Sequence, residues 1–90
     1  PTKLIEYLAS GIPVIATDSS EINQHFKHEE HLFIVAPDSH QDLQDAILER
    51  YDKFDEFNEM GLRGRGEVLE KFQFQSFQKS WGDFVLGNKT

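Results

Sequence analysis

A glycine and a proline that stand close together divide the first part of this chain into two segments with different patterns. The segment before them, Lys3–Ser10, carries apolar side chains at helical spacing. Gly11 suits the left-handed position that ends a helix, and Pro13 prevents the helix from continuing. The apolar run Pro13–Ala16 then favours a short strand covered on both faces, as in parallel sheets. The opening stretch therefore predicts a helix, a stop and a buried parallel strand.

The predicted first helix has an apolar side and a carboxylate that faces away from it. Leu4 and Leu8 share one face with Ile5 beside them, and Thr2 is placed to cap the helix. Glu6 lies about 200° around the helix from Leu4. A Glu at such a position is most often simply exposed. Open α/β folds, however, place ligand crevices at helix starts of this kind, where backbone N–H groups can bind phosphate and a carboxylate can accept hydrogen bonds from ribose.

The rest of the chain alternates between short apolar runs and amphipathic stretches. Asp38 or Ser39 can cap a helix after the second apolar run. By the same criteria the expected elements are a helix over Glu21–Phe26, a strand over Leu32–Val35, a helix containing Leu43, Ala46, Ile47 and Tyr51, a helix over about Asp52–Phe72, and a last helix over about Gln75–Leu86. We therefore predict an α/β fold: a partial Rossmann-like parallel sheet of about two strands with flanking helices.

Three glycines interrupt the long helix expected before Phe72. Gly61, Gly64 and Gly66 each weaken a helix by about 1 kcal/mol relative to Ala. We therefore expect a break or bend in this part of the chain.

Length, charge and composition limit the classes of protein that this chain can represent. Its 90 residues make one small domain or part of one. Because it begins on Pro1 inside a folding unit, we expect a single partial domain, residues 1–90, of a larger protein. A net charge of −7 argues against nucleic-acid binding, which leaves a basic footprint. The absence of cysteine excludes disulfides and thiol chemistry and fits a reducing compartment.

The opening stretch, PTKLIEYLASGIPVIATD, resembles the signature of the group 1 glycosyltransferases. In that family a Pro precedes a Leu/Ile-rich turn, a Glu, an Ala-rich turn and Gly-x-Pro-Val before a strand. The resemblance continues more weakly through the second strand and the next helix to the aromatic-led final segment. It implies a GT-B fold and a retaining enzyme that uses a nucleotide-sugar donor. It further implies that the chain is the C-terminal part of the donor-binding domain.

The resemblance also implies roles for residues of the first helix. Glu6 would be the second glutamate of the family's Glu-x7-Glu motif, which binds the donor ribose, and the first glutamate would lie upstream of Pro1. The backbone N–H groups of Lys3, Leu4 and Ile5, at the helix start opened by Thr2, would face the donor phosphates. Lys3 could also reach a phosphate with its side chain, although a first-turn Lys is more often solvated.

Beyond these residues, the resemblance implies no catalytic residue, metal or cofactor within this chain, and a nucleoside diphosphate sugar as the donor substrate. The remaining partner would be the N-terminal, acceptor-binding domain. The resemblance also implies a cytoplasmic enzyme, which could associate peripherally with a membrane through that domain.

Three histidines and two glutamates invite a metal-site hypothesis. His25, His28 and His31 lie close to Glu29 and Glu30. The string matches neither His-Glu-x-x-His nor His-x-x-Glu-His. Histidines in such a short stretch more often form a polar surface loop, and we favour that interpretation over a metal site.

Two further groups have both a structural and a functional interpretation. Asp18, Ser19 and Ser20 follow the first predicted strand, where they could touch sugar hydroxyls or cap the next helix, and we favour capping. Arg63 and Arg65 stand between glycines and could contact phosphate, but two arginines are weak evidence for such a site.

The last predicted helix carries an aromatic stripe made by Phe74, Phe77, Trp81, Phe84 and Val85. Its simplest role is core packing. We also consider self-association through Phe77, Trp81 and Phe84.

Two alternatives to glycosyl transfer remain open. One is another GT-B enzyme of the phosphorylase or epimerase type, and the other is a non-catalytic interaction domain that uses the aromatic stripe as its surface.

Overall fold

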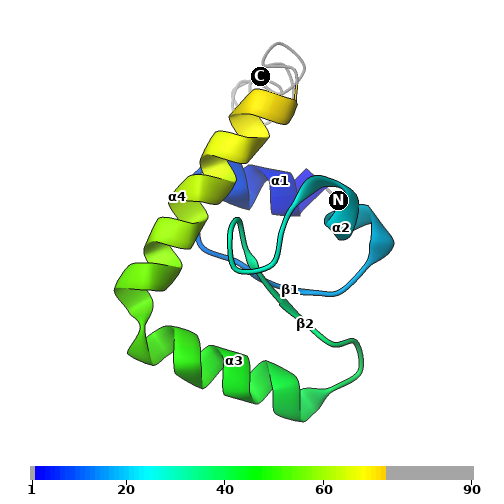
Figure 1. Ribbon diagram of the computed structural model, residues 1–90, viewed down its shortest axis with the longest axis vertical. Helices are drawn as coiled ribbons and strands as arrows, with labels where there is room; N and C mark the ends of the chain where they lie inside the picture. The colour runs from blue at the N-terminus through cyan, green and yellow to red at the C-terminus, as the bar shows by residue number, and fades with distance from the viewer. Residues whose placement is uncertain (1, 73–90) are drawn as a thin grey trace, which may run out of the picture.

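The computed structural model describes residues 2–72, and Figure 1 shows how their elements are arranged. The order along the chain alternates between helices and short strands before two consecutive helices. The elements are α1 (Thr2–Ala9), β1 (Ile15–Thr17), α2 (Ser20–His25), β2 (Phe33–Val35), α3 (His40–Asp52) and α4 (Phe54–Lys71). The predicted last helix, over about Gln75–Leu86, lies outside the described residues.

The two strands pair in parallel, which confirms the predicted α/β fold. Ile15 pairs with Phe33 and Thr17 with Val35, so the strands are in register along their whole length. The connection between them runs through α2, as a parallel pair requires a crossover. Within residues 2–72 the sheet consists of these two strands.

The turn after α1 forms for the reason that its sequence predicts. Gly11 has a φ of 77°, the left-handed conformation that glycine adopts without steric cost. Its N–H donates to the Leu8 carbonyl at 2.9 Å, and the Ile12 N–H donates to the Tyr7 carbonyl at 3.0 Å. These two bonds make a Schellman motif. Thr2 already lies inside the helix, so α1 begins one residue earlier than the sequence predicts and Thr2 is not its cap.

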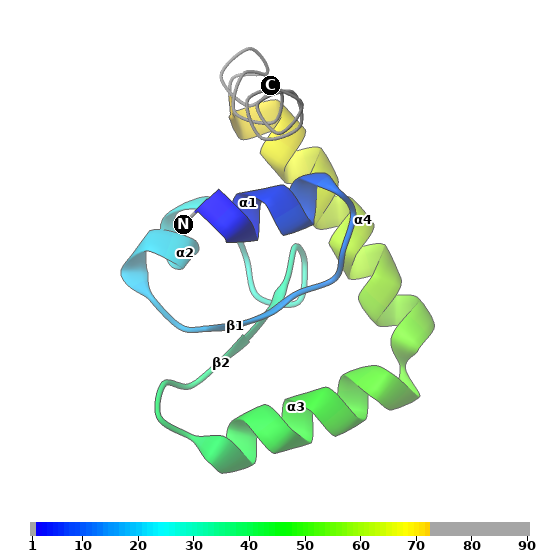
Figure 2. The same ribbon diagram turned by 180° about the vertical axis from the view of Figure 1, so that it is seen from behind.

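The core lies between α1, α2 and the far end of α4. Leu8 and Leu32 are fully buried and Val68 is 1% exposed. Ile22 and Phe26 complete this cluster. Figures 1 and 2 show from opposite sides that α4 crosses α1, and these two helices have the most extensive contact between elements of the described structure.

The expected break at the glycines is wrong, because α4 is continuous from Phe54 to Lys71. Gly61 and Gly64 instead face the rest of the molecule at very short range. A Cβ atom on Gly61 would lie 2.7 Å from the Pro13 nitrogen, and one on Gly64 would lie 2.6 Å from the His31 carbonyl oxygen. The packing that these glycines permit outweighs their weak helix propensity, which the sequence pattern alone had emphasised.

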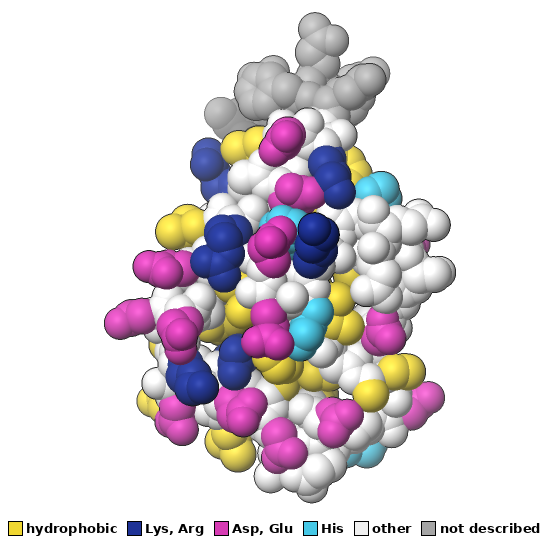
Figure 3. Space-filling view, in the orientation of Figure 1, with side chains coloured by type: hydrophobic (Ala, Val, Ile, Leu, Met, Phe, Trp, Pro, Cys, Tyr) yellow, Lys and Arg dark blue, Asp and Glu magenta, His cyan; other side chains and the backbone are white. Residues whose placement is uncertain are grey.

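Helix α3 begins with the predicted cap but buries little of its apolar surface. The Ser39 hydroxyl accepts a hydrogen bond from the Asp42 N–H at 3.1 Å. Ala46 is the buried residue of this helix, whereas Ile47 is 51% and Tyr51 79% exposed. Figure 3 shows acidic side chains spread over the lower part of the visible face, where α3 and the start of α4 lie.

Candidate functional site

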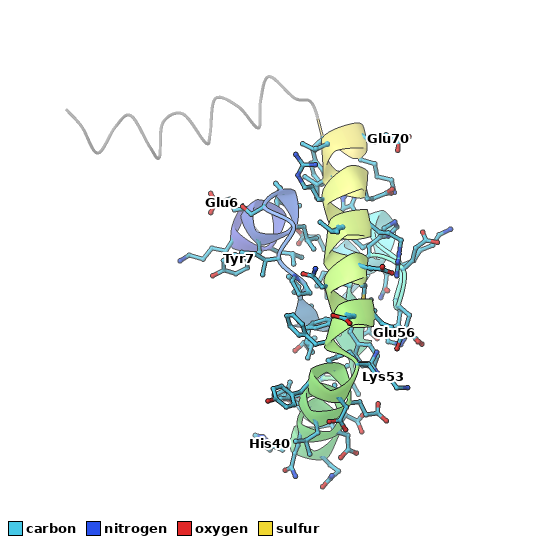
Figure 4. All side chains as sticks on the ribbon, turned by 90° about the vertical axis from the view of Figure 1, so that its left-hand side faces the viewer. Glu6, Tyr7, His40, Lys53, Glu56 and Glu70 are labelled. Carbon is cyan, nitrogen blue, oxygen red and sulfur yellow. The ribbon has the colours of Figure 1, made fainter. Side chains whose placement is uncertain are left out.

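Glu6 lies on the side of α1 that is turned away from α4. Figure 4 shows Glu6 and its neighbour Tyr7 pointing to that open side. Glu6 is half-buried, while Tyr7 is 45% exposed. Within residues 2–72 no hydrogen bond or ion pair engages the Glu6 carboxylate. Both carboxylate oxygens are therefore free, among the described residues, to accept hydrogen bonds from a ligand.

The start of α1 supplies backbone N–H groups that have no partner within the helix. In any α-helix the first four N–H groups lack an intrahelical acceptor and carry a partial positive charge. The first turn of α1 contains no acidic side chain that would occupy them. Lys3 is exposed there, whereas Leu4 and Ile5 are half-buried and direct apolar side chains toward the core. An anion can thus approach the backbone of this turn with a cation beside it.

The helix start and Glu6 lie within reach of one ligand. Glu6 is one helical turn from Thr2, which corresponds to about 5–6 Å along the axis. An anionic group at the first turn and a pair of hydroxyl groups beside Glu6 would fit a single small molecule. The structure therefore brings together the main-chain positions Thr2, Lys3, Leu4 and Ile5 and the carboxylate predicted from the sequence.

The polar residues after β1 serve the local fold. The Ser19 hydroxyl caps α2 by accepting a hydrogen bond from the Ile22 N–H at 3.2 Å. The Asp18 carboxylate accepts a hydrogen bond from the Asn23 side chain, and Ser20 is the first residue of α2. The preferred capping interpretation is confirmed for Ser19.

His31 is buried, so the predicted surface loop is wrong at this residue. The ring is 6% exposed, and its Nδ1 accepts a hydrogen bond from the Lys27 N–H at 3.0 Å. The proton of a neutral ring then stands on Nε2. That atom lies 3.1 Å from a carboxylate oxygen of Glu30 and 3.5 Å from one of Glu67. The histidine joins the turn at residues 27–31 to α4.

The other two histidines also make structural contacts. His28 accepts a hydrogen bond from the Ile34 N–H at 2.9 Å, and His25 packs its ring against Phe72. Within residues 2–72 no group of three His, Cys, Asp or Glu side chains is arranged to hold a metal ion.

A set of contacts that sequence reasoning missed joins α4 to the turn at residues 27–31. Arg63 donates to the Glu30 carbonyl at 2.8 Å, so this arginine is engaged by the protein backbone. Both Arg63 and Arg65 are exposed. Lys71 forms an ion pair with Glu67 at 2.8 Å. The hydrogen bond from Lys71 is the main reason that the pKa of Glu67 lies below its usual value. Only the i,i+4 spacing of Glu67 and Lys71 signals this arrangement in the sequence.

A groove lies between α1 and α2 and has a volume of about 200 Å³. Leu4 and Ile5 of α1 form one wall, and Ile22 forms part of the other. Glu6 does not line it, so the groove and the open side of α1 are different surfaces.

The association surface proposed from the sequence lies outside the described residues, since it consists of Phe77, Trp81 and Phe84. None of the helices within residues 2–72 has the length and hydropathy needed to cross a membrane.

Comparison with known proteins adds one finding to this geometry. A family model described as glycosyl transferases group 1 matches residues 1–53. Searches of curated proteins and of solved structures gave no match. The matched residues run from the start of α1 to the end of α3. They therefore include Glu6 and every backbone position of the candidate site.

Proposed function

The chain belongs to the group 1 glycosyl transferases, and from that premise we propose that it forms part of a nucleotide-sugar donor site. The full-length enzyme would transfer the sugar to an acceptor hydroxyl with retention of configuration at the anomeric carbon. The observation that carries this proposal is Glu6. Its carboxylate has no partner among the described residues and points to the open side of α1, one turn from the helix start.

Each part of the site has a chemical role in this proposal. The backbone N–H groups of Lys3, Leu4 and Ile5, at the helix start that includes Thr2, would bind the diphosphate, and the Lys3 ammonium would add a positive charge. Glu6 would accept hydrogen bonds from the two ribose hydroxyls. When the bond between the anomeric carbon and the diphosphate breaks, negative charge grows on the phosphate oxygens. Donors fixed in position stabilise that charge because they need no reorganisation.

The chemistry of transfer would need groups that precede these residues in the full-length protein. We assign no catalytic residue, metal or cofactor to this chain, which would bind the donor and stabilise the departing diphosphate. The acceptor would bind to an N-terminal domain. We place the enzyme in the cytoplasm and expect the isolated chain to be inactive.

The proposal is tested by Glu6→Gln in the full-length protein. We expect binding of UDP-, GDP- or ADP-sugar, measured by calorimetry, to weaken about tenfold or more. A hydrogen bond to a charged group contributes about 1.5–3 kcal/mol, and 1.4 kcal/mol corresponds to a factor of ten. Glu70→Gln is the matched control, because Glu70 is exposed at the far end of α4 (Figure 4). Equal affinities of the two variants, or no binding of any of these donors, would contradict the proposal.

A non-catalytic interaction domain remains the second candidate. It is favoured by the apolar side chains that the structure leaves exposed on α3 and at the start of α4, including Leu48 at 57% and Phe54 at 55%. The same calorimetric experiment separates the two candidates, since an interaction domain would bind none of the nucleotide sugars.

A further inference from the structure

The groove between α1 and α2 is apolar inside and open to solvent. Leu4 and Ile5 line one side, and Ile22 and Phe26 line the other. Glu21 and His25 add polar groups to its lining. The volume of the groove is about 200 Å³. An aromatic side chain suits an apolar groove because it buries about 150–250 Å² of surface. The groove adjoins the main core cluster, because Leu4 and Ile5 also pack against that cluster.

The described part of the chain ends at this groove. Phe72, the last described residue, lies in its lining. Helix α4 ends there, and Phe72 has an extended backbone, with φ −97° and ψ 134°. Its ring stacks against Phe26 with 6.5 Å between the ring centres. The segment that follows, residues 73–90, therefore starts at the mouth of the groove.

The sequence of that segment supplies a suitable side chain within reach. Phe74 is two residues beyond Phe72, a distance of at most about 7 Å along an extended chain. Residues i and i+2 of an extended chain also point to the same side. The segment carries Lys79 and Lys89 against one carboxylate, Asp83, whereas the whole chain has a net charge of −7. Its charge therefore complements the acidic body of the molecule.

We propose that this groove is a docking site for the chain's own C-terminal segment, with the Phe74 ring as the side chain that fills it. The docked ring would cover Leu4 and Ile5 from the side of α1 opposite to Glu6. The docking surface does not depend on the donor site proposed above, and its test involves no nucleotide.

The proposal is tested by thiol labelling in the full 90-residue chain, which contains no cysteine of its own. Ile5→Cys places a thiol in the groove, and Leu48→Cys places one on the exposed surface of α3. We expect a maleimide to label the Ile5→Cys thiol at least ten times more slowly than the Leu48→Cys thiol. Adding Phe74→Ala should raise the labelling rate of Ile5→Cys about tenfold. Adding Phe84→Ala, a matched loss of an aromatic ring, should leave that rate unchanged.

A buried reporter separates undocking from unfolding. Met60→Cys replaces a residue that is 4% exposed, and its labelling should remain slow when Phe74→Ala is present. Three outcomes would overturn the proposal. They are rapid labelling of Ile5→Cys in the otherwise unchanged chain, protection that Phe74→Ala does not remove, and protection that disappears on dilution. The last outcome would assign the groove to a second copy of the chain.

Discussion

His31 shows how one polar side chain can hold a turn against a helix. Its ring is buried, yet both nitrogens face polar groups, Nδ1 the Lys27 N–H and Nε2 the carboxylates of Glu30 and Glu67. Buried polar groups remain stable only when their hydrogen bonds are made. The residue therefore combines the packing of a core side chain with the directional contacts of a surface one.

Replacing His31 with Ala should destabilise the protein by about 2–3 kcal/mol, because the Lys27 N–H loses its acceptor and the ring leaves a cavity. Urea denaturation followed by circular dichroism measures this loss. His40→Ala is the control, since His40 is exposed on α3 (Figure 4) and its loss should change stability by less than about 0.5 kcal/mol. Similar destabilisation by both substitutions would refute the role given to His31.

Glu67 should make the stability of the protein depend on pH in a defined direction. Its pKa in the folded state lies below the usual 4.5, so its charged form stabilises the fold above that pH. This contribution is lost as the pH falls through the lowered pKa. The difference in unfolding free energy between the native protein and Glu67→Gln should therefore be largest above pH 4.5 and shrink in more acidic solution.

Urea titrations from pH 7 to pH 3 check this dependence. Glu70→Gln serves as the control, since Glu70 is exposed on the same helix. A stability difference for Glu67→Gln that stays constant across the range would show that the ion pair with Lys71 does not act in this way.

At the scale of the elements, α4 is positioned by its glycines. The side of the helix that carries Gly61 and Gly64 lies against the turn at Gly11–Pro13, against Leu8 and against the His31 backbone. Gly66 has no atom within 4 Å of a potential Cβ. The three glycines thus have the same helix propensity, but only Gly61 and Gly64 are packed closely against other parts of the molecule. This difference fixes how closely α4 approaches α1, the helix that carries Glu6.

Alanine substitution should therefore have opposite effects on the stability of the protein at Gly66 and at Gly64. Gly66→Ala should stabilise the protein by up to about 1 kcal/mol, because alanine favours the helix and meets no neighbour. Gly64→Ala should destabilise it by about 1–3 kcal/mol, because the new methyl group meets the His31 carbonyl and Leu8 at less than 3.0 Å. Thermal unfolding of the two variants compares them directly. Equal stabilisation by both would mean that the close contact at Gly64 is easily relieved.

At the scale of the whole molecule, the described structure has a small core and much exposed apolar surface. The buried apolar residues within residues 2–72 are Leu8, Ile22, Phe26, Leu32, Val35, Ala46, Phe57, Met60 and Val68. Several large side chains on α3 and α4 remain exposed, with Tyr51 at 79% and Leu62 at 55%. Small domains bury a smaller fraction of their surface and are correspondingly marginal in stability.

We accordingly expect the 90-residue chain to unfold at or below about 65 °C, the upper end of the range for mesophilic domains. Differential scanning calorimetry at neutral pH measures the midpoint. A sharp two-state transition well above that temperature would contradict the expectation. It would imply that the exposed apolar side chains of α3 contribute to stability in a way that the described fold does not explain.

Features that arise from local chemistry could be predicted from the amino-acid sequence. Gly11 and Pro13 end α1 because one adopts a left-handed backbone and the other cannot continue a helix. Ser39 starts α3 because its hydroxyl satisfies a free N–H group. The parallel pairing followed from the alternation of strands and helices. The carboxylate of Glu6 was correctly expected to face away from the core, while its role toward a ligand stays a prediction.

Features that depend on contacts between residues distant along the chain could be found only in the folded molecule. Gly64 allows α4 to lie close to the rest of the molecule because the His31 backbone lies directly against it, and no local pattern contains that contact. His31 is buried because α4 brings Glu67 to its ring. Ile47 and Tyr51 have the spacing of a core stripe, but they stay exposed because helical periodicity defines a face of the helix and only the neighbouring elements determine whether that face is covered.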